Sequence, residues 1–175
     1  AADSAVMVID GAKGVEPQTR KLFKVCALRH IPIFTFINKM DRETRDPLEL
    51  CEEVERELGI DTYAVNWPIG CGIDFKGVYD REKREILAFN EFHRGQDKIK
   101  AIECSLDDTE TLDSLIGEKL RRTLCDDVEL LDGAGYEFDI DQVRDGKLSP
   151  VFFGSALNNF GIEPFLESFL DMTMP

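Results

Sequence analysis

The residues Asn38-Lys39-Met40-Asp41 place an amide, a long aliphatic ammonium and a carboxylate directly after an apolar stretch. A carboxylate at Asp41 can accept two hydrogen bonds from the N1–H and the exocyclic amine of guanine, an edge that adenine lacks. Asn38 can meet the N7 and O6 edge or pin the neighbouring loops, and the stem of Lys39 can lie flat on the base. Because adenine would leave the carboxylate unpaired, the pattern predicts a loop that selects guanine.

A second loop, Ser155-Ala156-Leu157, follows the next predicted strand of the same sheet. Small residues after a strand are common, so this segment is informative only beside the first loop. We expect the backbone N–H of Ala156 to reach O6 of guanine and Ser155 to brace the loop. The predicted nucleotide-binding residues are therefore Asn38, Lys39, Met40, Asp41, Ser155, Ala156 and Leu157.

The sequence contains no GxxxxGK[ST] segment, so nothing in it is expected to cradle the β- and γ-phosphates of a nucleotide. We also expect no DxxG segment that holds Mg²⁺, and we interpret Asp10 as the end of a strand rather than a metal ligand. No catalytic residue and no metal ligand is predicted. The chain is expected to carry the base-reading half of a nucleotide site without the catalytic half.

Alternating strands and helices must position these loops. Three apolar runs predict strands buried in a parallel sheet, at Ser4–Ile9, Pro32–Ile37 and Ser149–Phe153. Helical spacing and capping residues predict helices at Pro17–Arg29, Asp46–Gly59 and Gly161–Met172. This order implies right-handed crossovers, and both loops then follow strand ends, where open α/β sheets bind ligands.

The middle of the chain has a different pattern, which predicts an antiparallel α+β insertion over residues 61–149. The expected elements are strands at Phe75–Asp80, Glu85–Phe89 and around Ile99–Cys104, a helix at Thr109–Cys125, and short acidic helical pieces at Asp126–Leu131 and Asp139–Asp145.

Charge is uneven along the chain: 35 Asp and Glu against 21 Lys and Arg give a net charge of −14. This balance disfavours a module whose own field attracts nucleic acid or an anionic membrane. The insertion carries 21 of the acids and 12 of the bases. Its surface is either a solvated acidic face or a docking surface for a basic partner.

The 175 residues allow one or at most two domains. Five scattered cysteines without a CxxC pair indicate free thiols in a reducing, cytoplasmic setting. No apolar run approaches the ~20 residues that cross a bilayer, so no membrane partner is expected. The chain enters a strand almost at once after Ala1, as if it were cut from something longer.

Four segments resemble the translational GTPases: DSAVMVIDGAKGVEPQTRKLF, IPIFTFINKMDRETRDPLEL, NWPIGCGIDFKGVYDRE and SPVFFGSALNNFGIEPFLESF. The NWPIG stretch favours the branch that acts in peptide-chain termination. The resemblance covers residues 1–175 and implies an α/β fold, the carboxyl-terminal half of a P-loop GTPase domain. Residues 1–60 and 150–175 would supply three parallel strands with flanking helices.

The resemblance also implies what the intact protein does. It would bind GTP and GDP, use Mg²⁺ whose ligands are absent from this chain, and hydrolyse GTP on the ribosome to recycle class I release factors. This chain alone is predicted to be inactive. The family's base-reading residues correspond to Asn38, Lys39 and Asp41, and its second base loop to Ser155, Ala156 and Leu157.

Two other functions remain open from the sequence. The chain could belong to an elongation-factor-G-like or ribosomal protection GTPase, or it could be an acidic protein-binding module to which nucleotide is incidental. In the sheet order that the resemblance implies, the apolar strand at Ala5–Ile9 would be internal. In this chain alone it becomes an edge, and we expect the chain to self-associate edge to edge or through helices.

Overall fold

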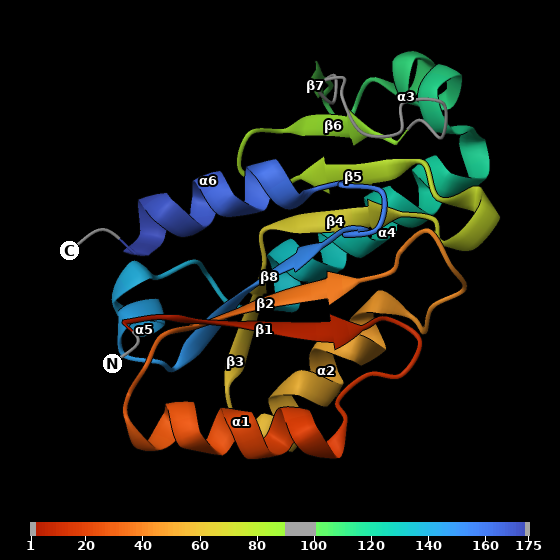
Figure 1. Cartoon of the computed structure of the whole chain (residues 1–175). Helices are drawn as coiled ribbons and strands as arrows, with labels where there is room; N and C mark the ends of the chain where they lie inside the picture. Colours follow the sequence, from red (N-terminus) through yellow and green to blue (C-terminus); the bar gives the residue numbers. More distant parts are fainter. Residues whose placement is uncertain (1–2, 90–100, 174–175) are drawn as a thin grey trace.

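The structure, a computed structural model, describes residues 3–89 and 101–173 and contains two β-sheets (Figure 1). The parallel sheet has the order β1 (Ala5–Asp10), β2 (Ile33–Asn38), β8 (Leu148–Phe153), β3 (Asp61–Ala64). The antiparallel sheet has the order β4 (Asn66–Ile69), β5 (Gly77–Asp80), β6 (Glu85–Ala88), β7 (Ala101–Glu103). The helices are α1 (Pro17–Leu28), α2 (Pro47–Leu58), α3 (Thr109–Ile116), α4 (Glu118–Ala134), α5 (Ile140–Arg144) and α6 (Ile162–Thr173), with a 3₁₀ turn at Gly72–Asp74.

The predicted α/β class is confirmed, and the structure adds a fourth parallel strand. This strand, β3, pairs with β8 from Asp61 to Ala64, although the sequence analysis assigned these residues to the insertion. Its four residues alternate between exposed and buried positions and form no apolar run. Such a short edge strand cannot be recognised without the neighbour that supplies its hydrogen bonds.

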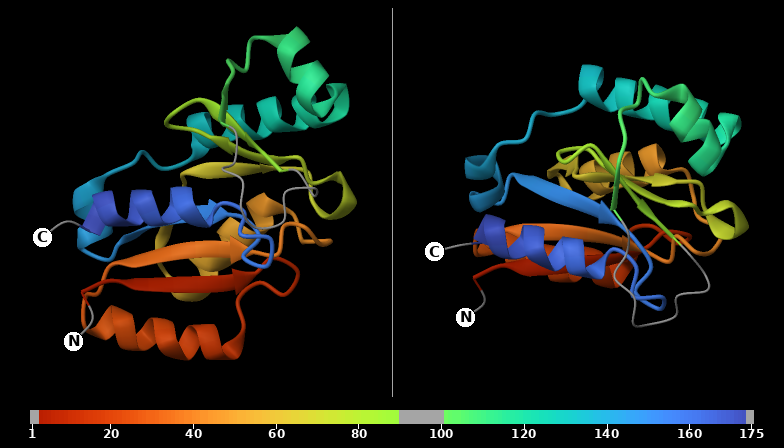
Figure 2. Two further views of the ribbon diagram at one scale, coloured as in Figure 1. Left: turned by 45° about the horizontal axis from the view of Figure 1, so that its top comes forward. Right: turned by 90° about the horizontal axis from the view of Figure 1, so that it is seen from above.

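Helices cover both faces of the parallel sheet, with α1 and α2 on one side and α6 on the other (Figures 1 and 2). Alternate residues of β2 therefore enter different parts of the core. Phe34 and Phe36 face α6, where their rings lie 4.9 Å from Phe169 and 5.4 Å from Phe165, respectively. Ile37 belongs to the other core cluster, which includes residues of α2.

Local signals in the sequence set the ends of α2. The Asp46 side chain accepts hydrogen bonds from Leu48 N at 2.8 Å and Glu49 N at 3.3 Å, and Pro47 occupies the first turn. Gly59 ends the helix with a φ of 68°, a left-handed conformation that suits glycine. The loop between β2 and α2 contains Lys39 to Asp41, so the cap at Asp46 fixes where this loop ends.

The predicted hairpin is confirmed, with Asp80 opposite Glu85 across its turn. The single helix predicted over Thr109–Cys125 is wrong, because Gly117 has a φ of 85° and separates α3 from α4. Apolar spacing continues across this break, so periodicity alone could not detect it. Within the described residues, none of these helices combines the length and hydropathy that crossing a bilayer requires.

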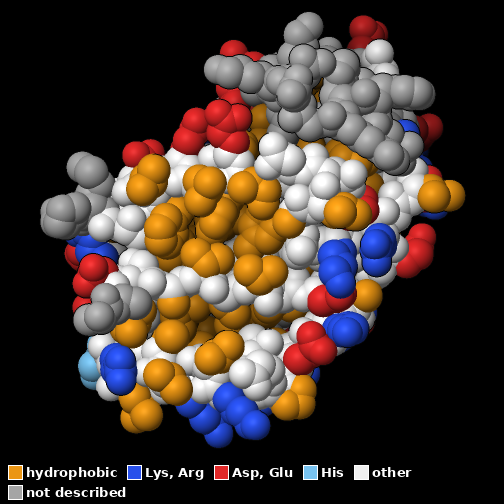
Figure 3. Space-filling view, viewed as in Figure 1, with side chains coloured by type: hydrophobic (Ala, Val, Ile, Leu, Met, Phe, Trp, Pro, Cys, Tyr) orange, Lys and Arg blue, Asp and Glu red, His pale blue; other side chains and the backbone are white. Residues whose placement is uncertain are grey.

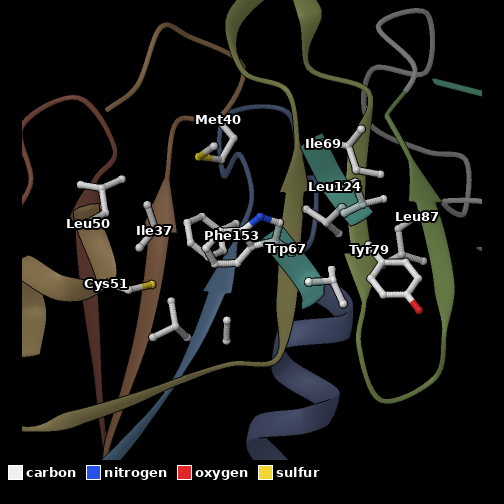
Figure 4. Close-up of a cluster of buried hydrophobic side chains, with 14 of the residues drawn as sticks. Ile37, Met40, Leu50, Cys51, Trp67, Ile69, Tyr79, Leu87, Leu124 and Phe153 are labelled. Atoms are coloured by element: carbon white, nitrogen blue, oxygen red, sulfur yellow. The ribbon is translucent and has the colours of Figure 1, made fainter. Parts of the chain in front are cut away.

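The core cluster that contains Ile37 joins the two sheets (Figure 4). Trp67 of β4 is fully buried, and its ring lies 5.3 Å from that of Phe153 at the end of β8. Leu124 of α4 and Met40 belong to the same cluster. The antiparallel sheet is therefore packed as part of the domain core and does not stand apart from the parallel sheet.

Among the strands of residues 3–89 and 101–173, β1 forms the other edge of the parallel sheet. Val6 and Val8 pair in register with Phe34 and Phe36, which places them on the face covered by α6. They remain 42% and 58% exposed, and Leu170 of α6 is 64% exposed. Figure 3 shows apolar side chains gathered on this side of the molecule.

We predict that Trp67→Phe lowers the free energy of unfolding by roughly 1–3 kcal/mol. The indole Nε1–H donates to Asp127 Oδ2 at 3.0 Å, and burial raises the pKa of Asp127 despite this bond. Phenylalanine would leave the carboxylate without its donor and a void beside Phe153. Urea unfolding followed by circular dichroism measures the change. Leu130→Ala, at a half-exposed position of α4, should change it by less than about 0.5 kcal/mol, and equal effects of the two variants would contradict the prediction.

Candidate functional site

The pairing of β2 with β8 brings both predicted base-reading loops to one edge of the parallel sheet. Ile37 lies opposite Phe153, so Asn38 and Gly154 leave their strands side by side. Gly154 N donates to Ile37 O at 3.0 Å, and Met40 N donates to Gly154 O at 3.1 Å. These two bonds continue the strand pairing into the loops and fix the position of one loop relative to the other.

Asn38 links the two loops through its side chain. Its Oδ1 accepts hydrogen bonds from Lys39 N and from Ala156 N, both at 2.8 Å. Of the two roles expected for Asn38, the structure thus contains the one that pins the neighbouring loop. The Ala156 N–H already donates to Asn38 Oδ1. O6 of a bound guanine would therefore share this donor with Asn38.

Asp41 and Ser155 form the second link between the loops. The buried Ser155 hydroxyl donates to Asp41 Oδ1 at 2.6 Å and accepts from Asn158 Nδ2 at 3.0 Å. Each carboxylate oxygen has two lone pairs, so this bond leaves Asp41 able to accept two further donors. Ser155 therefore fixes the carboxylate without using up its capacity.

Lys39 has an unusual backbone conformation and an anchored ammonium group. Its backbone has a φ of 70°, which is uncommon outside glycine, and its Nζ donates to Asp10 Oδ2 at 2.7 Å. The Lys39 hydrogen bond is the main reason that the pKa of Asp10 is lowered, and the N–H of Ala12 adds to it. With its ammonium anchored at the end of β1, the side chain of Lys39 runs from the end of β2 to the neighbouring strand end.

The loop that follows Asp10 is itself tied to α2. Glu53 is buried, accepts Val15 N at 2.8 Å and forms an ion pair with Arg45. Burial alone would raise the pKa of Glu53, but these partners bring it below its usual value. Gly14 has a φ of 72°, and a Cβ there would contact Glu53 and Arg45.

The remaining predicted residues, Met40 and Leu157, differ in solvent exposure. The Met40 side chain is fully buried in the core, so Met40 contributes only its backbone to the site. Leu157 is 78% exposed at the tip of its loop. The structure thus places the functional groups of Asn38, Lys39 and Asp41 with Ser155 and Ala156, whereas the side chain of Met40 points elsewhere.

Sequence reasoning missed Asp10 as a partner of Lys39, and Asn158 as a partner of Ser155. A signal for Asp10 was available, because it directly follows a parallel strand whose carboxyl end must lie at the same edge as that of β2. No comparable signal marks Asn158.

The expectation about DxxG needs a correction, since this spacing occurs at Asp74–Gly77 and at Asp132–Gly135. Asp74–Gly77 lies beside the antiparallel sheet, and Asp132–Gly135 at the end of α4. Within residues 3–89 and 101–173, no group of three or more His, Cys, Asp or Glu side chains is arranged to hold a metal ion. All five cysteines are free thiols, as predicted.

Comparison with known proteins identifies what the chain resembles. The family described as the elongation factor Tu GTP binding domain matches residues 1–175. Peptide chain release factor 3 of Cyanothece sp. is 53% identical over 174 residues, and that of Trichormus variabilis is 55% identical. Each match covers 99% of this chain and 32% of the relative, so the chain spans about a third of the length of these proteins. The resemblance to translational GTPases is confirmed.

A crystal structure of a protein from Thermus thermophilus has the same fold. It superposes with a TM-score of 0.69 at 19% sequence identity, over the whole of this chain and 27% of that one. Because identity is low, this similarity concerns the fold alone.

Proposed function

Because the chain belongs to the elongation factor Tu GTP-binding domain family, we propose that it is the guanine-recognising part of a factor that hydrolyses GTP during translation termination. The similarity to peptide chain release factor 3 over 99% of the chain supports the termination role. In this proposal the intact protein works in the cytoplasm on the ribosome and recycles class I release factors.

The observation that carries the proposal is the pair of hydrogen bonds between the two loops. Asn38 to Ala156, at 2.8 Å, and Asp41 to Ser155, at 2.6 Å, join a carboxylate, an amide and a backbone donor at one sheet edge. A guanine base presents N1–H and an amine to a carboxylate, and O6 to a backbone N–H, so its edge fits these groups. Adenine offers an acceptor and a C–H where Asp41 requires donors, and it would leave the remaining acceptor sites of the carboxylate without partners.

Each predicted residue then has a role in binding GTP or GDP. Asp41 reads N1–H and the exocyclic amine, Ser155 orients Asp41, and Ala156 meets O6. The stem of Lys39, anchored by Asp10, lies against the face of the base. Asn38 holds the two loops together, and Met40 and Leu157 complete the loops through their backbones.

The phosphates and Mg²⁺ would depend on residues outside this chain. Mg²⁺ neutralises the charge that develops on the transferred phosphoryl group. The DxxG spacings of this chain do not fit that role, because neither lies on the parallel sheet that carries the base loops. The parallel sheet, including β3 and the whole of β8, would thus belong to the base-reading half of a GTPase domain, with the segment between Ala64 and Leu148 as its insertion.

Other translational GTPases, such as an elongation-factor-G-like or ribosomal protection factor, share the same base chemistry and remain the alternative within this class. An acidic protein-binding module is the alternative outside it, favoured by the 21 acids against 12 bases in residues 61–149. The core shared between the two sheets favours the GTPase, because an independent module would not need to pack against the base loops.

We predict that Asp41→Asn in the intact protein weakens GDP binding by about 2–4 kcal/mol, roughly 30- to 1,000-fold in Kd. The amide oxygen can still accept from N1–H, but the amide nitrogen would face the exocyclic amine of guanine, which is also a donor. The same variant should gain affinity for xanthosine diphosphate, whose O2 accepts from the amide. Titration calorimetry with both nucleotides measures the switch.

Asp126→Asn, an exposed position on α4, serves as the control and should leave both affinities within about twofold. Unchanged GDP affinity in Asp41→Asn would contradict the proposed base contact.

We predict that the 175-residue chain alone binds GDP with a Kd on the order of 1 mM or weaker, because phosphate contacts supply most of the affinity. It should hydrolyse no measurable GTP. Titration with GDP and a phosphate-release assay test the two statements, and micromolar binding would refute the first.

We predict that the chain alone self-associates through the edge strand β1. No other strand of the described residues pairs with its outer side, and the exposed Val6 and Val8 add to a template for another strand. Light scattering at increasing concentration should show a rising average mass, and Val8→Lys should reduce it. A monomer at all concentrations would contradict this interpretation of the edge.

A further inference from the structure

Both base-reading loops rest on one segment of the antiparallel sheet. The Gly72 N–H donates to the carbonyl oxygens of Met40 and Arg42, at 3.1 Å each. These two carbonyls lie on either side of Asp41, so one donor fixes the backbone from which the Asp41 carboxylate projects. No residue of the parallel sheet makes this contact within the described part of the chain.

The same segment holds the second loop at its start. The buried Asn66 side chain accepts Phe153 N at 2.7 Å and donates to Phe153 O at 3.3 Å, in the manner of a paired strand residue. Phe153 is followed by Gly154 and Ser155, so Asn66 fixes the point at which this loop leaves β8.

Phe75 supports the end of that loop. Its ring meets Phe160 edge-on, with centroids 5.5 Å apart. Phe160 closes the loop on Ser155 through two backbone hydrogen bonds of 2.9 and 3.1 Å. The segment from Asn66 to Phe75 thus contacts the start and the end of one base loop and the middle of the other.

The turn within this segment depends on glycine. Gly72 has a φ of 60°, and a Cβ there would lie 2.6 Å from Glu43 Oε1. Gly70 has a φ of 72°, and its Cβ would lie 2.4 Å from the backbone oxygen of Asp74. The left-handed geometry of Gly72 aims its N–H at Met40 and Arg42, so a side chain at this position strains the contact.

We propose that Asn66–Phe75 is a positioning element for guanine recognition, so that nucleotide affinity and the conformation of the antiparallel sheet are coupled. This inference rests on the proposed function. Asp41 and Ala156 contact the base, while Gly72 and Asn66 act through them. By thermodynamic reciprocity, bound nucleotide stabilises the turn at Gly72 as much as the turn improves binding.

The test compares Gly72→Ala with Gly133→Ala in the intact protein. Both add one methyl group, but a Cβ at Gly133 in α4 has no heavy atom within 4 Å. Gly72→Ala should raise the Kd for GDP about 5- to 30-fold, because binding must restore a strained turn, and Gly133→Ala should leave it within about twofold. Urea unfolding measured in parallel shows whether either variant loses stability.

A double-mutant cycle distinguishes positioning from general destabilisation. In the Asp41→Asn background, Gly72→Ala should have little further effect on GDP affinity, because the contact that it positions is already lost. Fully additive effects would overturn the inference, as would a loss of stability in Gly72→Ala without any change in Kd.

Amide hydrogen exchange on the unmodified intact protein provides a test that needs no variant. Saturating GDP should slow exchange of the Gly72 amide more than that of amides in α4, and equal slowing would overturn the coupling.

The variants distinguish failure of this inference from failure of the proposed function. If Asp41→Asn leaves GDP affinity unchanged, the proposed function fails. If Asp41→Asn weakens GDP binding while Gly72→Ala has the same small effect as Gly133→Ala, only this inference fails.

Discussion

Parallel strands end at the same edge of a sheet, and the candidate site is built on the one pairing in which β2 lies beside β8. This pairing brings Asn38 and Ala156, 118 residues apart, within 2.8 Å of each other. It also allows Ser155 to reach Asp41. The contacts of Asn38 with Ala156 and of Asp41 with Ser155 therefore depend on a strand pairing that is independent of the loop sequences themselves.

The edge formed in this way is supported from two directions. From β1, Asp10 holds the ammonium of Lys39, and the loop that carries Asp10 is tied to α2 through Glu53. From the antiparallel sheet, Asn66 and Gly72 contact the backbone of the two loops. Loops that project from strand ends are usually mobile, and preorganising them lowers the entropy lost when a ligand binds. The support from two sides explains how short loops with polar side chains can hold a defined geometry.

Much of the architecture could be predicted because its signals are local. The caps of α2, the hairpin turn before Glu85 and the apolar run of β2 depend on neighbours within a few residues. Other features were missed because their causes are distant or conformational. The break at Gly117 depends on a backbone angle that periodicity does not record, and β3 becomes a strand only because β8 lies beside it.

For the candidate site, residue types and order alone predicted a guanine-recognition loop at Asn38, Lys39 and Asp41. They also predicted that Ser155 and Ala156 lie beside it, because both loops follow parallel strands that end at the same edge of the sheet. The tertiary structure decided the rest. It buried the Met40 side chain, gave Lys39 its partner Asp10 and placed Gly72 against the backbone on both sides of Asp41. These outcomes depend on which strand ends share an edge and on which backbone atoms face one another, and such distances arise only when the chain has packed.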